Sequence, residues 1–194
     1  MAHERPTGAA VLAAGASRRF GDEDKLAARL RGRALSEHVC AAIPAACFAK
    51  RWVIARSIDH PCVPAWRARG FCVAANPRAA QGLGTSLALA ARLAREAGCE
   101  GLVIALADMP FVPASHFEAL ARRMLAAGSE AIIASGHGEK RSVPAAFGSA
   151  QFARLERLAA DAGARGFLRE GEVVECPEQW LFDIDTPGDL ARLG

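Results

Sequence analysis

Short apolar runs alternate along this chain with longer stretches whose apolar positions recur at helical spacing. Continuous apolar runs are typical of strands that a parallel sheet buries on both faces. Such runs predict strands at residues 8–14, 51–55, 71–75, 101–107 and 130–134. The intervening stretches predict helices at about 35–47, 85–97, 150–160 and 187–193, and one beginning near Pro113. This alternation predicts an α/β fold, a doubly wound and mostly parallel sheet with helices on both faces.

Length and composition add bounds to this picture. The 194 residues fit one domain spanning residues 1–194, and a hydrophobic content of 52% excludes a disordered chain. The net charge of +3 does not favour a nucleic-acid or membrane partner. The chain has no apolar run long enough to span a bilayer and its start lacks the apolar core of a signal peptide, so we expect a cytoplasmic protein. Six cysteines without C-x-x-C spacing read as reduced thiols.

The loop after the first predicted strand is the most informative segment. Gly15 and Gly21 allow tight bends that expose backbone N–H groups, and Arg18, Arg19 and Lys25 add positive charge. These features suit a polyphosphate. The spacing matches neither the Walker loop nor the dinucleotide fingerprint, which disfavours a dehydrogenase.

A second glycine-containing loop, residues 76–86, follows the third predicted strand. Gly82 and Gly84 permit a tight turn before the next helix. Thr85 or Ser86 would either cap that helix or face the base and ribose of a nucleotide.

Three acidic residues are candidate metal ligands. Asp108 ends the most apolar strand, and Asp183 and Asp185 would point to the same side of an extended segment. Mg²⁺ prefers one or two carboxylates together with phosphate oxygens. The alternatives are a turn-forming or capping role for Asp108, and a cap by Asp185 or Thr186 for a helix that begins at Pro187. The five histidines have no ligand spacing and read as surface or helix residues.

Several motifs in order resemble the small nucleotidyltransferases of the molybdenum-cofactor type. They are Leu12-Ala-Ala-Gly-x-Ser-x-Arg-x-Gly21 with Lys25, Asn76-Pro, Gly82-Leu-Gly-Thr-Ser-Leu87, Ala107-Asp-Met-Pro110, Arg141 to Gly148, Asp161 to Arg165 and Asp183-Ile-Asp-Thr-Pro187. The resemblance covers nearly the whole chain and implies a Rossmann-like nucleotidyltransferase fold. Ala14 before Gly15 is similar to the cytidylyl branch, since the guanylyl branch usually has glycine there.

The resemblance implies an enzyme that joins CMP from CTP, or GMP from GTP, to a molybdopterin-type cofactor and releases pyrophosphate. It implies catalytic roles for Arg19, Lys25 and Asp108, and a Mg²⁺ or Mn²⁺ site at Asp108 with Asp185 or Asp183. The implied nucleotide contacts are Leu12, Ala13, Ala14, Gly15, Ser17, Arg19, Lys25, Asn76, Gly82, Gly84, Thr85 and Ser86. The implied acceptor contacts are Pro144, Phe147, Gly163 and Arg165. A recipient molybdoenzyme of the xanthine dehydrogenase type is the implied protein partner.

Departures from the family pattern leave other functions open. Asp22, Glu23 and Asp24 separate Gly21 from Lys25, where relatives often have two residues, and read as a solvated turn or an altered acceptor site. The alternatives are nucleotidyl transfer with another base or to a sugar or alditol phosphate, and a non-catalytic module that delivers cofactor to a molybdoenzyme.

Overall fold

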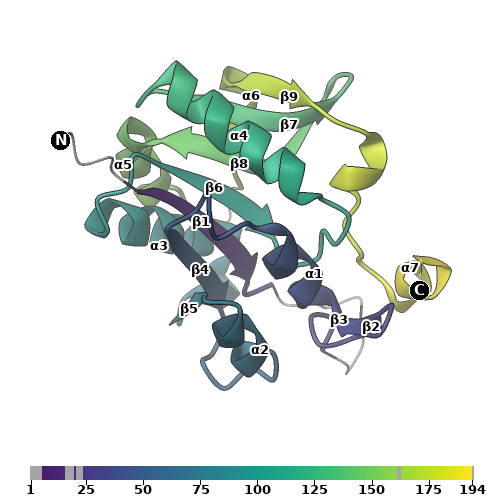
Figure 1. Cartoon of the computed structure of the whole chain (residues 1–194). Helices are drawn as coiled ribbons and strands as arrows, with labels where there is room; N and C mark the ends of the chain where they lie inside the picture. Colours follow the sequence, from purple (N-terminus) through teal and green to yellow (C-terminus); the bar gives the residue numbers. More distant parts are fainter. Residues whose placement is uncertain (1–5, 16–19, 21–23, 161–162, 194) are drawn as a thin grey trace.

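The computed structural model describes residues 6–15, 20, 24–160 and 163–193. A seven-stranded sheet lies at its centre, in the order β5-β4-β1-β6-β8-β7-β9 (Figure 1). The strands are β1 (Thr7–Ala13), β4 (Lys50–Ala55), β5 (Cys72–Ala75), β6 (Gly101–Leu106), β7 (Ile132–His137), β8 (Lys140–Gly148) and β9 (Glu172–Glu175). Only β8 runs against its neighbours within this sheet. The predicted mostly parallel sheet is therefore confirmed.

Strand β1 lies inside the sheet, next to the central strand β6, and its seven residues are all buried. Its continuous apolar run fits this position, because helices cover both faces of the sheet there. Leu12 pairs with Ile54 of β4 on one side and with Leu106 of β6 on the other. The chain moves outward from β1 to β4 and β5, then returns to add β6 on the opposite side. The strand order thus reverses between β1 and β6.

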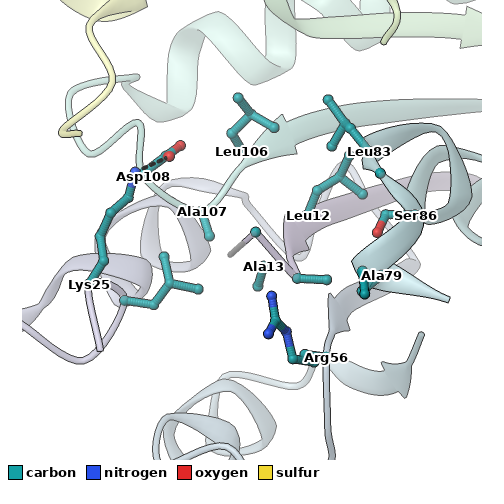
Figure 2. A pocket seen from close by; sticks show the side chains of 15 residues that line it. Leu12, Ala13, Lys25, Arg56, Ala79, Leu83, Ser86, Leu106, Ala107 and Asp108 are labelled. Carbon is teal, nitrogen blue, oxygen red and sulfur yellow. Dashed lines mark hydrogen bonds and ion pairs between the residues drawn. The ribbon is translucent and has the colours of Figure 1, made fainter. Parts of the chain in front are cut away.

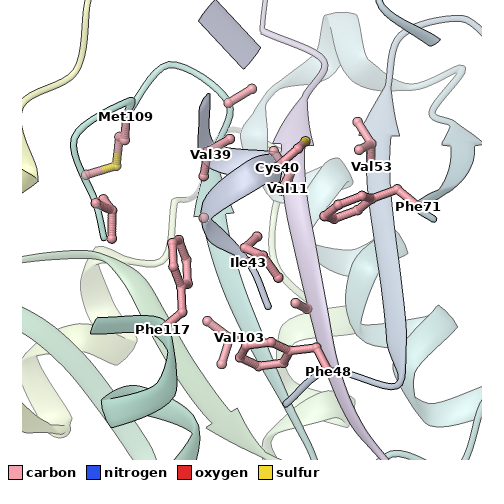
Figure 3. Close-up of a cluster of buried hydrophobic side chains, with 14 of the residues drawn as sticks. Val11, Val39, Cys40, Ile43, Phe48, Val53, Phe71, Val103, Met109 and Phe117 are labelled. Carbon is pink, nitrogen blue, oxygen red and sulfur yellow. The ribbon is translucent and has the colours of Figure 1, made fainter. Parts of the chain in front are cut away.

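Two apolar cores lie on the two faces of the sheet. On one face, α1 (Leu35–Ala42), α2 (Val63–Ala68) and α4 (Ala114–Ala127) cover the strands. Figure 3 shows Val39 and Phe117 from these helices beside Val11 and Val103 from the sheet. On the other face, α3 (Leu83–Glu96), α5 (Phe152–Glu156) and α6 (Arg165–Glu170) pack their apolar sides against the sheet. Both faces are covered, as a doubly wound fold requires.

A smaller apolar cluster ties the end of the chain to the segment after β1. Phe20, Leu30, Leu35 and Ile184 form it. Its members come from the segment after β1, from β2 (Arg29–Leu30), which forms a hairpin with β3 (Arg33–Ala34), from the start of α1 and from the segment before α7 (Pro187–Leu193). The remaining short elements are the 3₁₀ helices η1 (Ala79–Gln81), η2 (Ser149–Gln151) and η3 (Glu178–Leu181). This cluster brings residues near position 185 beside those near position 25.

The predicted elements differ from the structure in definite places. The helix predicted at 35–47 ends at Ala42, ahead of Pro44, which cannot continue a helix. The helix predicted at 150–160 is only Phe152–Glu156. Strands β8 and β9 and helices α2 and α6 were not predicted. No helix in the described ranges is long and apolar enough to cross a membrane.

Candidate active site

A cavity of about 590 Å³ lies at the edge where the carboxyl ends of the central strands meet (Figure 2). Ligands of doubly wound sheets bind outside this edge, at the point where the strand order reverses. Gly15 follows β1, Arg56 follows β4 and Asp108 follows β6, and all three line the cavity. The fold therefore gathers residues from distant parts of the chain around one space.

Most of the expected nucleotide contacts that the structure describes line this cavity. They are Leu12, Ala13, Ala14, Gly15, Lys25, Gly82 and Ser86. Gly82 has a φ of +133°, a region that side-chain-bearing residues rarely adopt, and it leads the chain into α3. Ser17 and Arg19 lie outside the described residues.

Three other expected nucleotide contacts, Asn76, Gly84 and Thr85, are buried and do not line the cavity. The Asn76 Nδ2 amide donates hydrogen bonds of 2.9 Å to both Thr85 Oγ1 and Ser86 Oγ. The Thr85 hydroxyl donates to the Gly82 carbonyl at 2.8 Å. Of the two alternatives for Thr85 and Ser86, the side-chain cap is wrong, because the helix begins at Leu83 and Gly82 precedes it without a side-chain cap. These groups instead brace the loop that carries Gly82 and Ser86.

An ion-paired centre lies at one end of the cavity. The Lys25 ammonium is 2.7 Å from Asp108 Oδ2 and 3.0 Å from Asp185 Oδ1. Figure 2 shows the Lys25 and Asp108 side chains pointing toward each other. Burial lowers the pKa of Lys25, but the two carboxylates outweigh it and the net pKa is raised. Lys25 therefore stays a cation while only 6% exposed.

One carboxylate oxygen of Asp108 is suited to bind a cation. Burial raises the pKa of its carboxyl group, and the Lys25 ammonium only partly opposes this effect. Its Oδ1 atom is buried and has no hydrogen-bond partner among the described residues. A desolvated carboxylate oxygen without a donor is suited to a divalent cation. Asp108 and Asp185 therefore fit the pair of carboxylates that Mg²⁺ or Mn²⁺ prefers, and a cluster of three acidic, cysteine or histidine ligands is absent from the described residues.

Asp183 and Asp185 make different contacts. Asp183 is exposed and lines a second cavity, whereas Asp185 contacts Lys25. The segment between them is not a strand, and the Ile184 N–H donates to the Asp108 carbonyl at 3.0 Å. The charge of Asp183 also raises the pKa of the Asp108 carboxyl group, so Asp183 lies near this centre as well. The cap predicted for the last helix does form, since the Asp189 N–H donates to Thr186 Oγ1 at 3.1 Å.

The second cavity, of about 560 Å³, adjoins the first, and Leu106 lines both. Its charged residues are predominantly basic. They are Lys140, Arg141, Arg165 and Arg169, with Glu139 and Asp183 as the acidic members. A space lined this way favours an anionic ligand.

Of the expected acceptor contacts, Arg165 lines this basic cavity. Pro144 and Phe147 do not line it. Both are buried in β8, and the Phe147 ring packs edge-on against Phe167 at 6.2 Å. Gly163 lies beside Leu83, which lines the first cavity. The proline and phenylalanine of this motif thus belong to the sheet and its core.

Arg56 is a candidate functional residue that sequence reasoning missed. Its side chain points from the end of β4 toward Ala13 in the first cavity (Figure 2). It is exposed, and among the described residues it has no ion pair. The sequence feature that could have identified Arg56 is its position directly after a predicted strand, at the same sheet edge as Gly15 and Asp108.

Comparison with known proteins identifies the family. The family model described as a MobA-like NTP transferase domain matches residues 9–175. This chain belongs to the MobA-like NTP transferase family. The purine catabolism protein PucB of Bacillus subtilis is 32% identical over 208 aligned positions, which cover 91% of this chain and 90% of PucB. Phosphoenolpyruvate guanylyltransferase of Sphaerobacter thermophilus is 35% identical over 121 positions, covering 58% of this chain and 55% of that enzyme.

Solved structures share the fold of this MobA-like protein at low sequence identity. A molybdopterin-guanine dinucleotide biosynthesis protein A from Archaeoglobus fulgidus superposes with a TM-score of 0.72, 23% identity and 96% coverage of both chains. The Rv0371c protein of Mycobacterium tuberculosis, solved in complex with manganese, gives a TM-score of 0.69, 22% identity and 97% coverage of both chains. These structures show that the chain has the nucleotidyltransferase fold.

Proposed function

We propose that this protein transfers CMP from CTP to a molybdopterin-type molybdenum cofactor, with Mg²⁺ as the metal and pyrophosphate as the second product. The observation that carries the proposal is the convergence of Lys25, Asp108 and Asp185 at one end of the first cavity, which the basic second cavity adjoins. One cavity has a glycine-containing backbone wall, and the other is basic. Two such spaces suit a nucleotide and an anionic acceptor that meet at a cation-binding centre.

The first cavity would hold the nucleotide. The backbone from Leu12 to Gly15 would contact the phosphates and ribose, while Gly82 and Ser86 would face the base. Arg56 would add a positive charge toward the same ligand. Ser17 and Arg19 keep the roles that the resemblance implies, as further contacts to the triphosphate.

Asp108 and Asp185 would hold Mg²⁺, which when bound would neutralise phosphate charge during transfer. Lys25 would then donate hydrogen bonds to phosphate oxygens, where its fixed charge stabilises the charge that develops in the transition state. Mn²⁺ has the same preference for oxygen ligands and would be an alternative metal.

The basic cavity would hold the acceptor. Arg165, with Arg141 and Arg169, would orient its terminal phosphate. An oxygen of that phosphate attacks the α-phosphorus of CTP, the bond to the bridging oxygen of the β-phosphate breaks, and pyrophosphate leaves with that electron pair. The protein's contribution is positioning and charge stabilisation, as in other phosphoryl transfers.

GTP is the second candidate nucleotide, favoured by the similarity to phosphoenolpyruvate guanylyltransferase. That similarity also keeps a different phosphorylated acceptor open. The cytidylyl branch is preferred because this chain has Ala14 before Gly15. A delivery module without catalysis would not need the paired carboxylates and Lys25, so it ranks below both transferases.

The proposed recipient of the product is a molybdoenzyme of the xanthine dehydrogenase type. The similarity to a purine catabolism protein supports this partner, because xanthine oxidation is a step of purine breakdown. A cytoplasmic location is also proposed, since all six cysteines are free thiols, as expected in a reducing compartment.

Product analysis tests the proposal. The purified protein is incubated with Mg²⁺, molybdopterin-type cofactor and one of CTP, GTP, ATP or UTP, and the cofactor fraction is analysed by mass spectrometry. A mass increase equal to CMP, found with CTP alone, supports the proposal. A GMP adduct would move the protein to guanylyl transfer, and an unmodified cofactor in all four reactions would refute this acceptor.

A further inference from the structure

Lys25 is held in a short turn whose first residue, Asp24, forms several bonds. The Asp24 Oδ1 atom accepts the Leu26 N–H at 2.9 Å. The Asp24 carbonyl accepts the N–H groups of Ala27 and Ala28, both at 3.0 Å. Asp24 therefore closes the turn that contains Lys25 and fixes the backbone that follows it.

His60, from the segment before α2, reaches the same aspartate. Its Nε2 atom lies 2.8 Å from Asp24 Oδ2. Its Nδ1 atom accepts the Cys62 N–H at 3.1 Å, so Nδ1 carries no proton and the proton of the ring is on Nε2. The ring is thereby fixed in the tautomer that donates to Asp24.

The histidine ring is also fixed by packing. It stacks on Trp66 with 4.9 Å between ring centroids and an angle of 23° between planes. Trp66 is fully buried, and its indole Nε1 donates to Ser36 Oγ at 3.1 Å. The His60 side chain is 13% exposed. It is therefore an anchored donor, unlike a mobile side chain in a surface ion pair.

The other neighbour of Lys25 is tied to the same helices. The Leu26 carbonyl accepts the Ser36 N–H at 3.2 Å and the Ser36 hydroxyl at 3.1 Å. Lys25 thus lies between two anchored residues, and its ammonium meets Asp108 and Asp185 from a backbone position that both neighbours define.

We propose that His60 and Asp24 form a positioning pair that holds the Lys25 turn, and so places the Lys25 ammonium between Asp108 and Asp185. The pair touches neither carboxylate of the centre and acts through the turn. Its effect on catalysis rests on the proposed nucleotidyl transfer, whereas its effect on the position of Lys25 does not. Asp24 belongs to the acidic cluster that departs from the family pattern, and this role assigns it a function other than solvation or acceptor binding.

Lysine acetylation tests the position of Lys25 without any activity assay. The chain has three lysines, and Lys50 and Lys140 are exposed internal references. Each variant is treated with an acetylating succinimidyl ester, and the rate at each lysine is measured by peptide mass spectrometry. In His60→Ala, the acetylation rate at Lys25 relative to the two references is expected to rise about five- to tenfold. This is the change expected when one charge-assisted hydrogen bond is lost.

Matched variants separate positioning from general damage. His60→Gln, which can still donate near the position of Nε2, should restore most of the protection of Lys25. His137→Gln changes an exposed histidine that is bonded to the Cys176 carbonyl, and it should leave the ratio unchanged. An unchanged Lys25 ratio in His60→Ala would overturn the proposal, as would an equal rise at all three lysines.

A kinetic measurement tests the catalytic consequence. In His60→Ala, kcat for transfer should fall about five- to tenfold with little change in KM for the nucleotide. The double variant with Asp24→Ala and His60→Ala should have the same kcat as Asp24→Ala alone. Additive losses in the double variant would contradict a shared role. If the wild-type protein transfers no nucleotide, the proposed function fails while the labelling result still decides the positioning pair.

Discussion

Lys25 and Asp108 are 83 positions apart in the sequence, yet the Lys25 Nζ atom lies 2.7 Å from Asp108 Oδ2. The first follows the loop after β1, and the second ends the turn after β6, the strand paired with β1. Their contact joins the expected phosphate-binding loop to the expected metal ligand. The cavity at this edge of the sheet therefore contains an ion-paired centre.

Replacing Lys25 should remove one preorganised positive charge from the centre. We expect Lys25→Ala to lower kcat for transfer about 10²- to 10³-fold, the usual cost of losing one such group. Steady-state kinetics with CTP and acceptor measure this effect. Lys50→Ala, at an exposed lysine, is the control, and an equal rate in both variants would remove Lys25 from catalysis.

The two candidate partners of Asp108 should differ in effect. Asp185→Asn should lower metal-dependent transfer by about 10²-fold or more, since it removes one of two charged ligands. Asp183→Asn should change the rate by less than about fivefold, because Asp183 is exposed and forms no ion pair with Lys25. Titration of the rate with Mg²⁺ compares them. A larger loss in Asp183→Asn would reverse the assignment of the second ligand.

Arg56 should act on nucleotide binding more than on the chemical step. We expect Arg56→Ala to raise KM for CTP about tenfold with a small change in kcat, as for the loss of one charged contact made equally in ground and transition states. Arg92→Ala, on the exposed side of α3, is a matched control. A fall in kcat at constant KM would place Arg56 against the reacting phosphates instead.

Burial of His116 predicts a pH dependence of stability. Burial lowers its pKa to about 4 from the ordinary value of 6.5, and its Nε2 atom lies 2.7 Å from Ser135 Oγ. Below pH 6.5 the unfolded chain binds a proton that the folded protein does not bind until about pH 4. The free energy of unfolding should therefore fall with acidification in this window, by about 1 kcal/mol per pH unit from this group.

Urea unfolding at several pH values measures this slope. His116→Gln should lose part of the slope, whereas the exposed His137→Gln should retain it. Equal slopes in the wild type and in His116→Gln would show that His116 does not contribute.

The sequence predicted the parallel strands other than β9 because each of them contains a continuous apolar run, as in β1 and β6. It did not predict β8, which starts with charged residues and contains Pro144. That motif was interpreted as an acceptor contact, although Pro144 and Phe147 are buried in the sheet. Whether a side chain of β8 is buried depends on the hydrogen-bonded pairing of this strand with β6 and β7. The local sequence pattern does not show that pairing.

The site was predictable where strand ends carry distinctive residues, as at Gly15 and Asp108. It was not predictable where a role depends on packing between distant segments. His60 was interpreted as a surface or helix residue, but stacking on Trp66 aims it at Asp24. The contact of Asp185 with Lys25 likewise depends on the packing of the neighbouring Ile184 into a cluster with Phe20.

The central claim is nucleotidyl transfer at the Lys25–Asp108–Asp185 centre. The most direct test is pyrophosphate release from CTP with Mg²⁺, measured with and without molybdopterin-type cofactor, for the wild type and Asp108→Asn. The account predicts cofactor-dependent release by the wild type, and a loss of about 10²-fold or more in a folded Asp108→Asn protein. Release at the same rate by both proteins, or none from a wild type supplied with every substrate, would contradict it.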